Sequence, residues 1–362
     1  MTLTAASGLA IFIGTYTPKD GESRGIYAVQ LDPATGALSA PVLAAETPQP
    51  TFLAWSPDRR TLFALGEGVG PNGQVSGGAA AFRFDPATRA LAPLNARGAG
   101  GAGTTHLAAD ATGRVLVTAS YSGGQVASFP IGPDGRLGPR AAWLAPTGEL
   151  GPNRQRQDKP HPHSVTLSPD NRFAYVCDLG LDRVFRYRVD PATAALTPAG
   201  ETATTPGAGP RHAKFSADGK FLYVINELDS TIATYGAEAD GSLAGRQAIS
   251  TLPEGFSGAN ICAEIRLSPD GRFVYGSNRG HDSIAVFARD ARAGTLTLVE
   301  IVPCGGRHPR NFNLSPDGRW LVCANRDTNN LVVYRVDPGT GRLSSTGHTA
   351  AVFQPVCVLF VE

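Results

Sequence analysis

Two histidines flank a proline in the stretch QDKPHPHSV, residues 157–165. His161 and His163 could form a metal clip, part of a catalytic group, or plain loop structure. Their spacing across the proline could suit a chelate on an extended strand, but no third ligand recurs in motif form, and the HExxH and CxxC patterns of zinc sites are absent. We therefore expect no metal and no cofactor. His163 is the stronger catalytic candidate, since histidine exchanges protons near neutral pH.

Arginine and glutamate occur in three further short motifs. GPRHAKFS contains Arg211, VINELDSTI contains Glu227, and YGSNRGHD contains Arg279. Guanidinium groups bind carboxylates and phosphates through paired hydrogen bonds, and they stabilise negative charge that develops on a carbonyl oxygen. With a histidine, such a set suits proton transfer on an anionic substrate, provided that the fold brings the residues together. The alternative is a ring of ion pairs whose members only neutralise one another.

One pattern recurs six times along the chain: an apolar alternating run, a turn with the core Ser-Pro-Asp-Gly, and a second apolar run. In this turn proline presets φ, aspartate bonds back to the backbone, and glycine supplies the residue with positive φ. Each copy therefore predicts a β-hairpin. The turns recur every 47 to 58 residues, at Ser56, Asp110, Ser168, Ser216, Ser268 and Ser315.

A second pattern has seven copies: an apolar strand, a turn such as Asp-Pro-Ala-Thr-Gly, and another strand. The first pattern lacks a seventh copy, but the C-terminal fragment QPVCVLFVE can supply the inner strand of a unit whose other strands, LAIFIGTY and GIYAVQLD onward, come from the N-terminus. Seven units of four strands predict an all-β, seven-bladed β-propeller in a single domain, residues 1–362, with a closing blade shared by the N- and C-termini. Ring closure leaves only short, protected strand edges.

This topology places both kinds of repeated turn on one face of the ring, so the inner strands begin, and the second strands end, on the opposite face. The inner strands are expected to begin at Thr51, Thr105, His163, Arg211, Ala263–Glu264, Arg310–Asn311 and Val356. The second strands are expected to end at Tyr16, Glu67, Tyr121, Asp178, Glu227, Asn278–Arg279 and Asn325–Arg326. Two long irregular loops, LAPTGELGPNRQRQDKPHPH and LPEGFSGANICAE, open on this face as a lid or wall. Charged side chains thus gather at one mouth of the channel, which favours a site for an anionic substrate.

The motifs also resemble those of the lactonase family of seven-bladed β-propellers, which includes propeller-type 6-phosphogluconolactonases and 3-carboxy-cis,cis-muconate cyclases. The resemblance covers essentially the whole chain. It implies that His163, Arg211, Glu227 and Arg279 form the catalytic set and that the protein hydrolyses a lactone. We expect 6-phosphogluconolactone, of the pentose phosphate pathway, as the substrate. The alternatives are a cycloisomerase acting on a muconate and a binding propeller without turnover. The motifs that carry the resemblance are PHPHSV, GPRHAKFS, VINELDSTI, AEIRLSPDGRFVYGSNRGHDSIAVF and RHPRNFNLSPDGRWLVCANRD.

Hydrolysis of a lactone requires a base that activates water and positive charge near the developing oxyanion. His163 or Glu227 could be the base, while Arg211 and Arg279 could hold the oxyanion or an acidic group of the substrate. A phosphate could be bound either by the loop before His161 or by the motif GGRHPRN, through Arg154, Arg156 and Lys159 or through Arg307 and Arg310. The residues expected to bind substrate are His161, Glu264, Arg307, Arg310 and Asn311.

Bulk composition excludes other classes of function. Lysine and arginine number 32 against 31 aspartates and glutamates, a net charge of +1, so nothing indicates nucleic acid or an anionic membrane as a partner. No stretch approaches the roughly 18 apolar residues of a membrane span. Five cysteines lack CxxC spacing, and Cys177 and Cys323 are expected to be buried thiols. We expect a cytoplasmic monomer or small homo-oligomer whose partner is a small anionic lactone.

Overall fold

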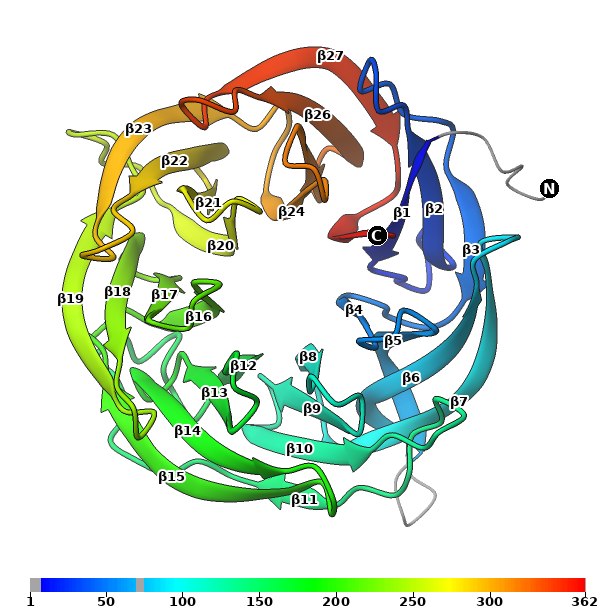
Figure 1. Ribbon diagram of the computed structural model, residues 1–362, viewed down its shortest axis with the longest axis vertical. Coiled ribbons are helices and arrows are strands. Elements are labelled where there is room, and N and C mark those ends of the chain that lie inside the picture. The colour runs from blue at the N-terminus through cyan, green and yellow to red at the C-terminus, as the bar shows by residue number, and fades with distance from the viewer. Residues whose placement is uncertain (1–7, 70–74, 362) are drawn as a thin grey trace.

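The computed structural model describes residues 8–69 and 75–361, which form 28 strands in seven four-stranded antiparallel sheets around a central channel (Figure 1). In these two ranges there is no helix. The predicted all-β, seven-bladed propeller is therefore confirmed. Alternating apolar residues explain the sheets, because both faces of most blades pack against neighbouring blades and the buried side chains fill the spaces between them.

Each blade runs outward from the channel in four antiparallel strands. The innermost strands are β28 (Pro355–Phe360), β4 (Leu53–Trp55), β8 (Thr104–Ala109), β12 (Pro162–Leu167), β16 (Pro210–Phe215), β20 (Ile261–Leu267) and β24 (Pro309–Leu314). The second strands are β1 (Leu9–Thr15), β5 (Thr61–Val69), β9 (Val115–Ser120), β13 (Phe173–Asp178), β17 (Phe221–Asn226), β21 (Phe273–Arg279) and β25 (Trp320–Asn325).

The outer two strands of each blade complete the ring. The third strands are β2 (Gly25–Leu31), β6 (Val75–Asp85), β10 (Gln125–Pro130), β14 (Arg183–Asp190), β18 (Thr231–Ala237), β22 (Ser283–Arg289) and β26 (Asn330–Val336). The fourth strands are β3 (Val42–Glu46), β7 (Ala90–Gly101), β11 (Ala142–Leu144), β15 (Ala195–Ala203), β19 (Leu243–Ser250), β23 (Leu296–Pro303) and β27 (Leu343–Ala351).

The closing blade combines both ends of the chain, as predicted. The C-terminal strand β28 pairs antiparallel with β1, with Ile11 opposite Phe360 and Ile13 opposite Val358, and β2 and β3 continue the sheet outward. Trp55 of the next blade donates its indole N–H to the carbonyl oxygen of Phe360 at 2.9 Å. This arrangement closes the ring with hydrogen bonds between strands, so β1 does not present a free edge to the channel.

The repeated turns have the conformation that their residues favour. In the turn at 268–271, Gly271 donates to the carbonyl of Ser268 at 2.8 Å and has a φ of 70°. Asp270 accepts hydrogen bonds from the Ser268 hydroxyl at 2.6 Å and from the backbone of Arg272 at 3.1 Å. Asn171 takes the glycine's place in another copy, with a φ of 60° that asparagine tolerates. These turns hold one face of the ring in a regular form and leave the other face to the loops that vary.

All five cysteines are buried and free. Burial raises the pKa of the Cys177 thiol to about 12, so this thiol stays protonated and inert near neutral pH. The prediction that Cys177 and Cys323 are buried is confirmed. Within the described ranges, no helix has the length and apolar character needed to cross a membrane.

Candidate active site

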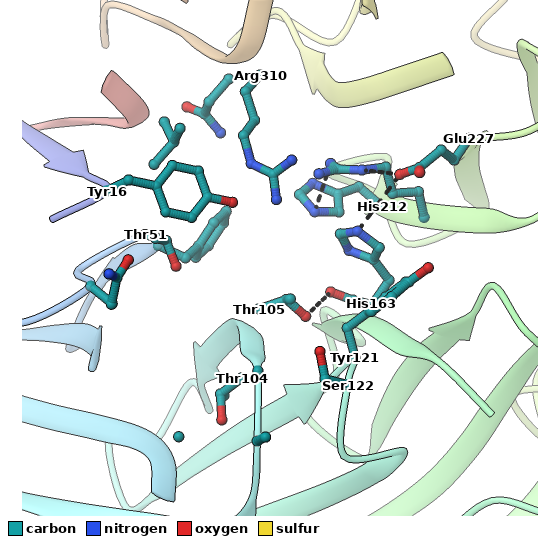
Figure 2. A pocket seen from close by; sticks show the side chains of 18 of the residues that line it. Tyr16, Thr51, Thr104, Thr105, Tyr121, Ser122, His163, His212, Glu227 and Arg310 are labelled. Atoms are coloured by element: carbon teal, nitrogen blue, oxygen red, sulfur yellow. Dashed lines mark hydrogen bonds and ion pairs between the residues drawn. The ribbon is translucent and has the colours of Figure 1, made fainter. Parts of the chain in front are cut away.

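A cavity of about 1000 Å³ opens at one mouth of the channel, where the inner strands begin and the second strands end (Figure 2). Its lining combines both rows of residues that the predicted topology placed together. Members of the first row are Thr51, Thr105, His163, Arg211, Arg310, Asn311 and Val356, and members of the second are Tyr16, Tyr121, Glu227, Arg279 and Arg326. The side chain of Glu67 lies outside the part of the chain that the structure describes.

A β-bulge near the start of the inner strand explains how these side chains reach the cavity. Six blades have an irregular register at this position, where the inner strand has an extra residue relative to its partner. A bulge turns the extra residue out of the regular pleat and redirects its side chain. The extra residues are Val356, Thr105, His163, Arg211 and Arg310 in five blades, and the pair Ala263–Glu264 in the sixth. The five single residues all line the cavity.

Glu227 is the only carboxylate in the described lining of the cavity, and three arginines contact it. Its Oε2 accepts from Arg211 Nε at 2.8 Å and lies 2.8 Å from Arg279 Nη2, while Oε1 contacts Arg156. Burial alone would raise the pKa of this carboxyl, but the positive charges of Arg279 and Arg211 hold it well below 4.5. Glu227 is therefore ionised across the physiological range.

Arg211 connects the carboxylate to the neighbouring blades. Its Nη1 donates to the carbonyl of Ala263 at 2.6 Å and lies 3.1 Å from His212 Nε2, whereas Nη2 has no partner among the described residues. Burial and the nearby Arg279 and Arg310 lower the pKa of Arg211 to about 9, which leaves the guanidinium charged at pH 7. The position of Arg211 is thus fixed, and one nitrogen remains available to a ligand.

His163 lies beside Glu227 and the arginines that contact it, and its imidazole is neutral. Its Nε2 lies 3.7 Å from Glu227 Oε2, and its Nδ1 is buried without a hydrogen-bond partner in the described structure. Burial, followed by the positive charge of Arg211, lowers the pKa of His163 well below 6.5, even though Glu227 acts in the opposite direction. A neutral imidazole can accept a proton, and the adjacent carboxylate would stabilise the imidazolium that forms.

A chain of hydrogen-bonded polar residues, His212, Glu264 and Asn311, supports Arg211. A guanidinium can only donate, so His212 Nε2 accepts from Arg211, and the proton of His212 is on Nδ1, 3.3 Å from Glu264 Oε1. The other oxygen of Glu264 accepts from the amide of Asn311, whose Oδ1 accepts from the backbone of Val358 at 2.9 Å. Glu264 is completely buried and does not line the cavity, while Asn311 does. This network positions Arg211 and links the closing blade to the site.

The loop at 145–161 forms one wall of the site. Gln157 is completely buried, donates to the carbonyl of Leu179 at 2.8 Å and accepts from the backbone of Asn153 at 2.9 Å. Arg156 reaches Glu227 from this loop, and Lys159 donates to the carbonyl of Ser122 at 2.7 Å. These contacts favour a fixed wall over a lid.

His161 lies behind the wall and does not line the cavity. Its ring stacks on Tyr121 with centroids 4.1 Å apart, Nδ1 lies 2.9 Å from the carbonyl of Tyr121, and Nε2 lies 2.9 Å from Asp158. His163 contacts the same tyrosine ring edge-on at 5.4 Å. Both nitrogens of His161 are engaged, so the structure places this histidine as a support for Tyr121, and its predicted contact with substrate stays a prediction.

The opposite wall comes from the blade that contains β24 and β25. Arg310 is half-buried and extends into the cavity, with its guanidinium carbon 5.6 Å from the centre of the Tyr16 ring (Figure 2). His308 and Arg326 lie beside it in the lining. Arg307 is exposed and outside the lining, although it is only three residues away. Its predicted substrate contact also stays a prediction.

Three features of the lining were not among the predicted site residues. His308 precedes β24 with a positive φ of 60°, and the repeated patterns do not include it. His212 lies in the motif GPRHAKFS and Arg156 is one of the candidate phosphate ligands, but the sequence gives no sign of their bonds to Arg211 and Glu227. The motif GGRHPRN, which places a histidine between two arginines, was the signal that could have identified His308.

The described residues contain no cluster of three or more histidine, cysteine, aspartate or glutamate side chains that could hold a metal ion. The arrangement can bind an anion, since five arginines and one carboxylate line the cavity. It can also accept a proton at His163 close to those positive charges. These are the requirements for adding water to an activated ester.

Comparisons with known proteins agree with this chemistry. The family model described as "Lactonase, 7-bladed beta-propeller" matches residues 10–360. A 6-phosphogluconolactonase of Bacillus subtilis is 37% identical over 353 residues, 97% of this chain and 98% of that protein. A 6-phosphogluconolactonase of Formosa agariphila is 31% identical over 83% of this chain and 85% of its own length. The structure of the periplasmic gluconolactonase of Pseudomonas aeruginosa superposes with a TM-score of 0.91 and 35% identity, over 98% of this chain and 99% of the other.

Proposed function

The chain belongs to the lactonase family of seven-bladed β-propellers, and on that premise we propose that it hydrolyses 6-phosphogluconolactone to 6-phosphogluconate. The observation that carries the proposal is a neutral histidine beside an ionised glutamate, in a cavity lined by five arginines. A substrate with a phosphate group and an ester carbonyl fits a cavity with this charge.

In the proposed reaction His163 is the general base. It takes a proton from a water molecule as the water oxygen bonds to the lactone carbonyl, and Glu227 stabilises the resulting imidazolium from 3.7 Å. Arg211, through its free Nη2, stabilises the negative charge that develops on the carbonyl oxygen. When the ester bond breaks, the imidazolium returns the proton to the ring oxygen, which leaves as the C5 hydroxyl.

Glu227 is less suited to be the base. Its two oxygens are engaged by three arginines, and its pKa lies well below 4.5, so it has little tendency to accept a proton. Its proposed role is to hold Arg211 and Arg279 and to favour the protonated form of His163. This proposal favours His163 over Glu227 as the base, a choice that the sequence leaves open.

The test is the rate of lactone loss with freshly prepared 6-phosphogluconolactone, corrected for spontaneous hydrolysis. We expect His163→Ala to lower kcat by about 10² to 10⁴-fold, the usual contribution of a general base. His348→Ala is the matched control, because His348 lies on the outer strand β27, away from the cavity, and should retain wild-type activity. No acceleration by the wild-type protein would contradict the proposal. Turnover of 3-carboxymuconate instead would favour the cycloisomerase.

The cytoplasmic location, the monomeric or small homo-oligomeric state, and the absence of nucleic-acid and membrane partners stay predictions. A small anionic lactone as the ligand follows from the proposed reaction. Size-exclusion chromatography with light scattering would measure the oligomeric state, and fractionation of the source cells would test the location.

A further inference from the structure

Several hydrogen-bond donors that line the cavity have no partner among the described residues. The Arg310 guanidinium makes no hydrogen bond or ion pair within the described structure, and it lies against the Tyr16 ring, 5.6 Å from the ring centre. Two neighbouring donor positions, His308 Nε2 and Arg279 Nε, are buried and also have no partner in that part of the chain. All three residues line the cavity.

Such an arrangement is costly for the free protein. A buried polar group that loses water without gaining a partner destabilises the fold, and the cost is greater for charged groups. The positive charge of the cavity is also not fully balanced. Glu227 is the only carboxylate in the described lining, and it already contacts three of the five arginines there. Of the other two, Arg326 has Asp327 at 2.6 Å, which leaves Arg310 without an acidic partner in the described structure. An anion bound here would satisfy the free donors together.

The other basic residues that could bind a phosphate are exposed or already engaged. Arg156 is bonded to Glu227, and Lys159 donates to the carbonyl of Ser122. Arg154 and Arg307 are exposed and outside the lining of the cavity. Arg310 differs from its neighbour Arg307 because it occupies the bulge of β24, which directs its side chain toward the cavity.

We propose that Arg310, with His308 of the same blade, binds the phosphate of the substrate and makes the enzyme selective for phosphorylated over unphosphorylated lactones. This inference rests on the proposed function. The phosphate would accept paired hydrogen bonds from the Arg310 guanidinium and one from His308 Nε2, which selects the tautomer with its proton on that nitrogen. The lactone ring would then extend toward His163 and Arg211, so that one cavity holds both the phosphate and the reacting carbonyl.

The experiment compares kcat/KM for 6-phosphogluconolactone and for glucono-1,5-lactone in the same variants. We expect Arg310→Ala to lower the ratio of the two values by about 100-fold, the effect of losing a paired charged hydrogen bond. Arg310→Lys keeps the charge but not the paired geometry, and should lose about tenfold. Lys19→Ala is the matched control: it removes one positive charge from an exposed residue three positions after Tyr16 and should leave the ratio within twofold of wild type.

Binding of inorganic phosphate provides a measurement that does not depend on the phosphorylated substrate. Phosphate should inhibit glucono-1,5-lactone hydrolysis competitively, with an inhibition constant that rises at least about tenfold in Arg310→Ala. An unchanged ratio and an unchanged inhibition constant in a variant with a wild-type melting temperature would overturn the inference. So would an equal effect of Arg307→Ala. If the wild-type protein hydrolyses neither lactone, the proposed function fails instead, and the two failures are therefore distinguishable.

Discussion

At the scale of single residues, the site depends on a glutamate that is surrounded by positive charge. Glu227 contacts Arg156, Arg211 and Arg279, so its own basicity is suppressed while its negative charge remains. That charge has two consequences: it fixes the arginines in place, and it raises the otherwise depressed pKa of His163. Removing one member of a buried ion pair leaves the other charge buried without a partner. The free-energy cost of this generally exceeds the net stabilisation that the intact pair provides. We therefore expect Glu227 to contribute both to the stability and to the chemistry of the site.

The pH dependence of kcat/KM should identify the base. This parameter reports ionisations of the free enzyme, and burial together with Arg211 lowers the pKa of His163 well below 6.5. The base is therefore unprotonated from pH 6.5 to 8, and we expect a flat profile there with an acid limb below pH 6.5. An acid limb centred at or above pH 6.5 would contradict a buried, neutral His163.

Glu227→Gln provides the matched variant for this profile. It removes the carboxylate that favours the imidazolium, so the pKa of His163 should fall further and the acid limb should move to still lower pH while kcat drops. If Glu227 were the base, this substitution would abolish the limb together with the activity. Measuring both profiles in buffers of constant ionic strength, with the spontaneous rate subtracted, separates the two assignments.

At the scale of elements, β-bulges and one loop determine which side chains reach the cavity. The bulges near the starts of the inner strands direct His163, Arg211 and Arg310 toward the mouth of the channel. The loop at 145–161 adds Arg156 without any regular secondary structure, and Gln157 fixes the loop by two hydrogen bonds of its amide. A rigid wall of this kind keeps Arg156 on Glu227 without the cost of ordering the loop when substrate binds.

Gln157→Ala should release this wall. One of the two amide hydrogen bonds is buried and the other is partly buried, so we expect a loss of about 1 to 3 kcal/mol in the free energy of unfolding. Trypsin should then cleave faster after Arg154 or Arg156, and KM should rise because Arg156 no longer stays on Glu227. The readouts are urea unfolding, the cleavage rate with mass-spectrometric assignment of the site, and steady-state kinetics.

Gln247→Ala is the control for the loop experiment. Gln247 makes the same two kinds of bond, donating to the carbonyl of Leu296 at 2.9 Å and accepting from its backbone N–H at 2.7 Å, between outer strands of neighbouring blades. It should lower stability without changing cleavage in the loop or KM. Cleavage of Gln157→Ala at the wild-type rate would show that other contacts hold the wall.

The elements also explain what the sequence could predict and what it could not. Repeated turns and alternating strands are local, so the blades, the shared closing blade and the two rows of residues at one mouth follow from the pattern. The contact between Arg156 and Glu227 depends on the path of an irregular loop. The sequence of this loop has no repeating pattern from which its path could be predicted. Arg307 and Arg310 are two arginines of one short motif, so residue type cannot distinguish them. A β-bulge at Arg310 determines that only Arg310 lines the cavity.

At the scale of the whole molecule, the site exists only when the ring is closed. Tyr16 follows β1 near the N-terminus, whereas Arg310 begins the last complete blade, and closure through β28 brings the two into contact. The amide of Asn311 joins Glu264 to the backbone of β28, so the same closure supports the residues beneath Arg211. The site is therefore coupled to the global stability of the propeller.

Buried ionisable groups determine how that stability depends on pH. His106, His163 and His212 are buried, and burial, followed by nearby positive charges or histidines, lowers the pKa of each well below 6.5. Burial and the positive charge of Arg279 also lower the pKa of His308 to about 3. Asp178 has the opposite effect, because burial raises its pKa to about 6.

We expect the free energy of unfolding to fall as the pH drops below about 6.5. The unfolded chain then binds protons on histidines that stay neutral in the folded ring, and each fully buried histidine costs about 1.4 kcal/mol per pH unit. Asp178, protonated in the folded protein below about pH 6 but ionised in the unfolded chain down to about pH 4, opposes one of these losses. The net loss between pH 6 and 5 is on the order of a few kcal/mol, measurable by urea unfolding at both values. His106→Gln should reduce the loss of unfolding free energy per pH unit by about the contribution of one histidine. A free energy of unfolding that does not change with pH would contradict the neutral state of the buried histidines.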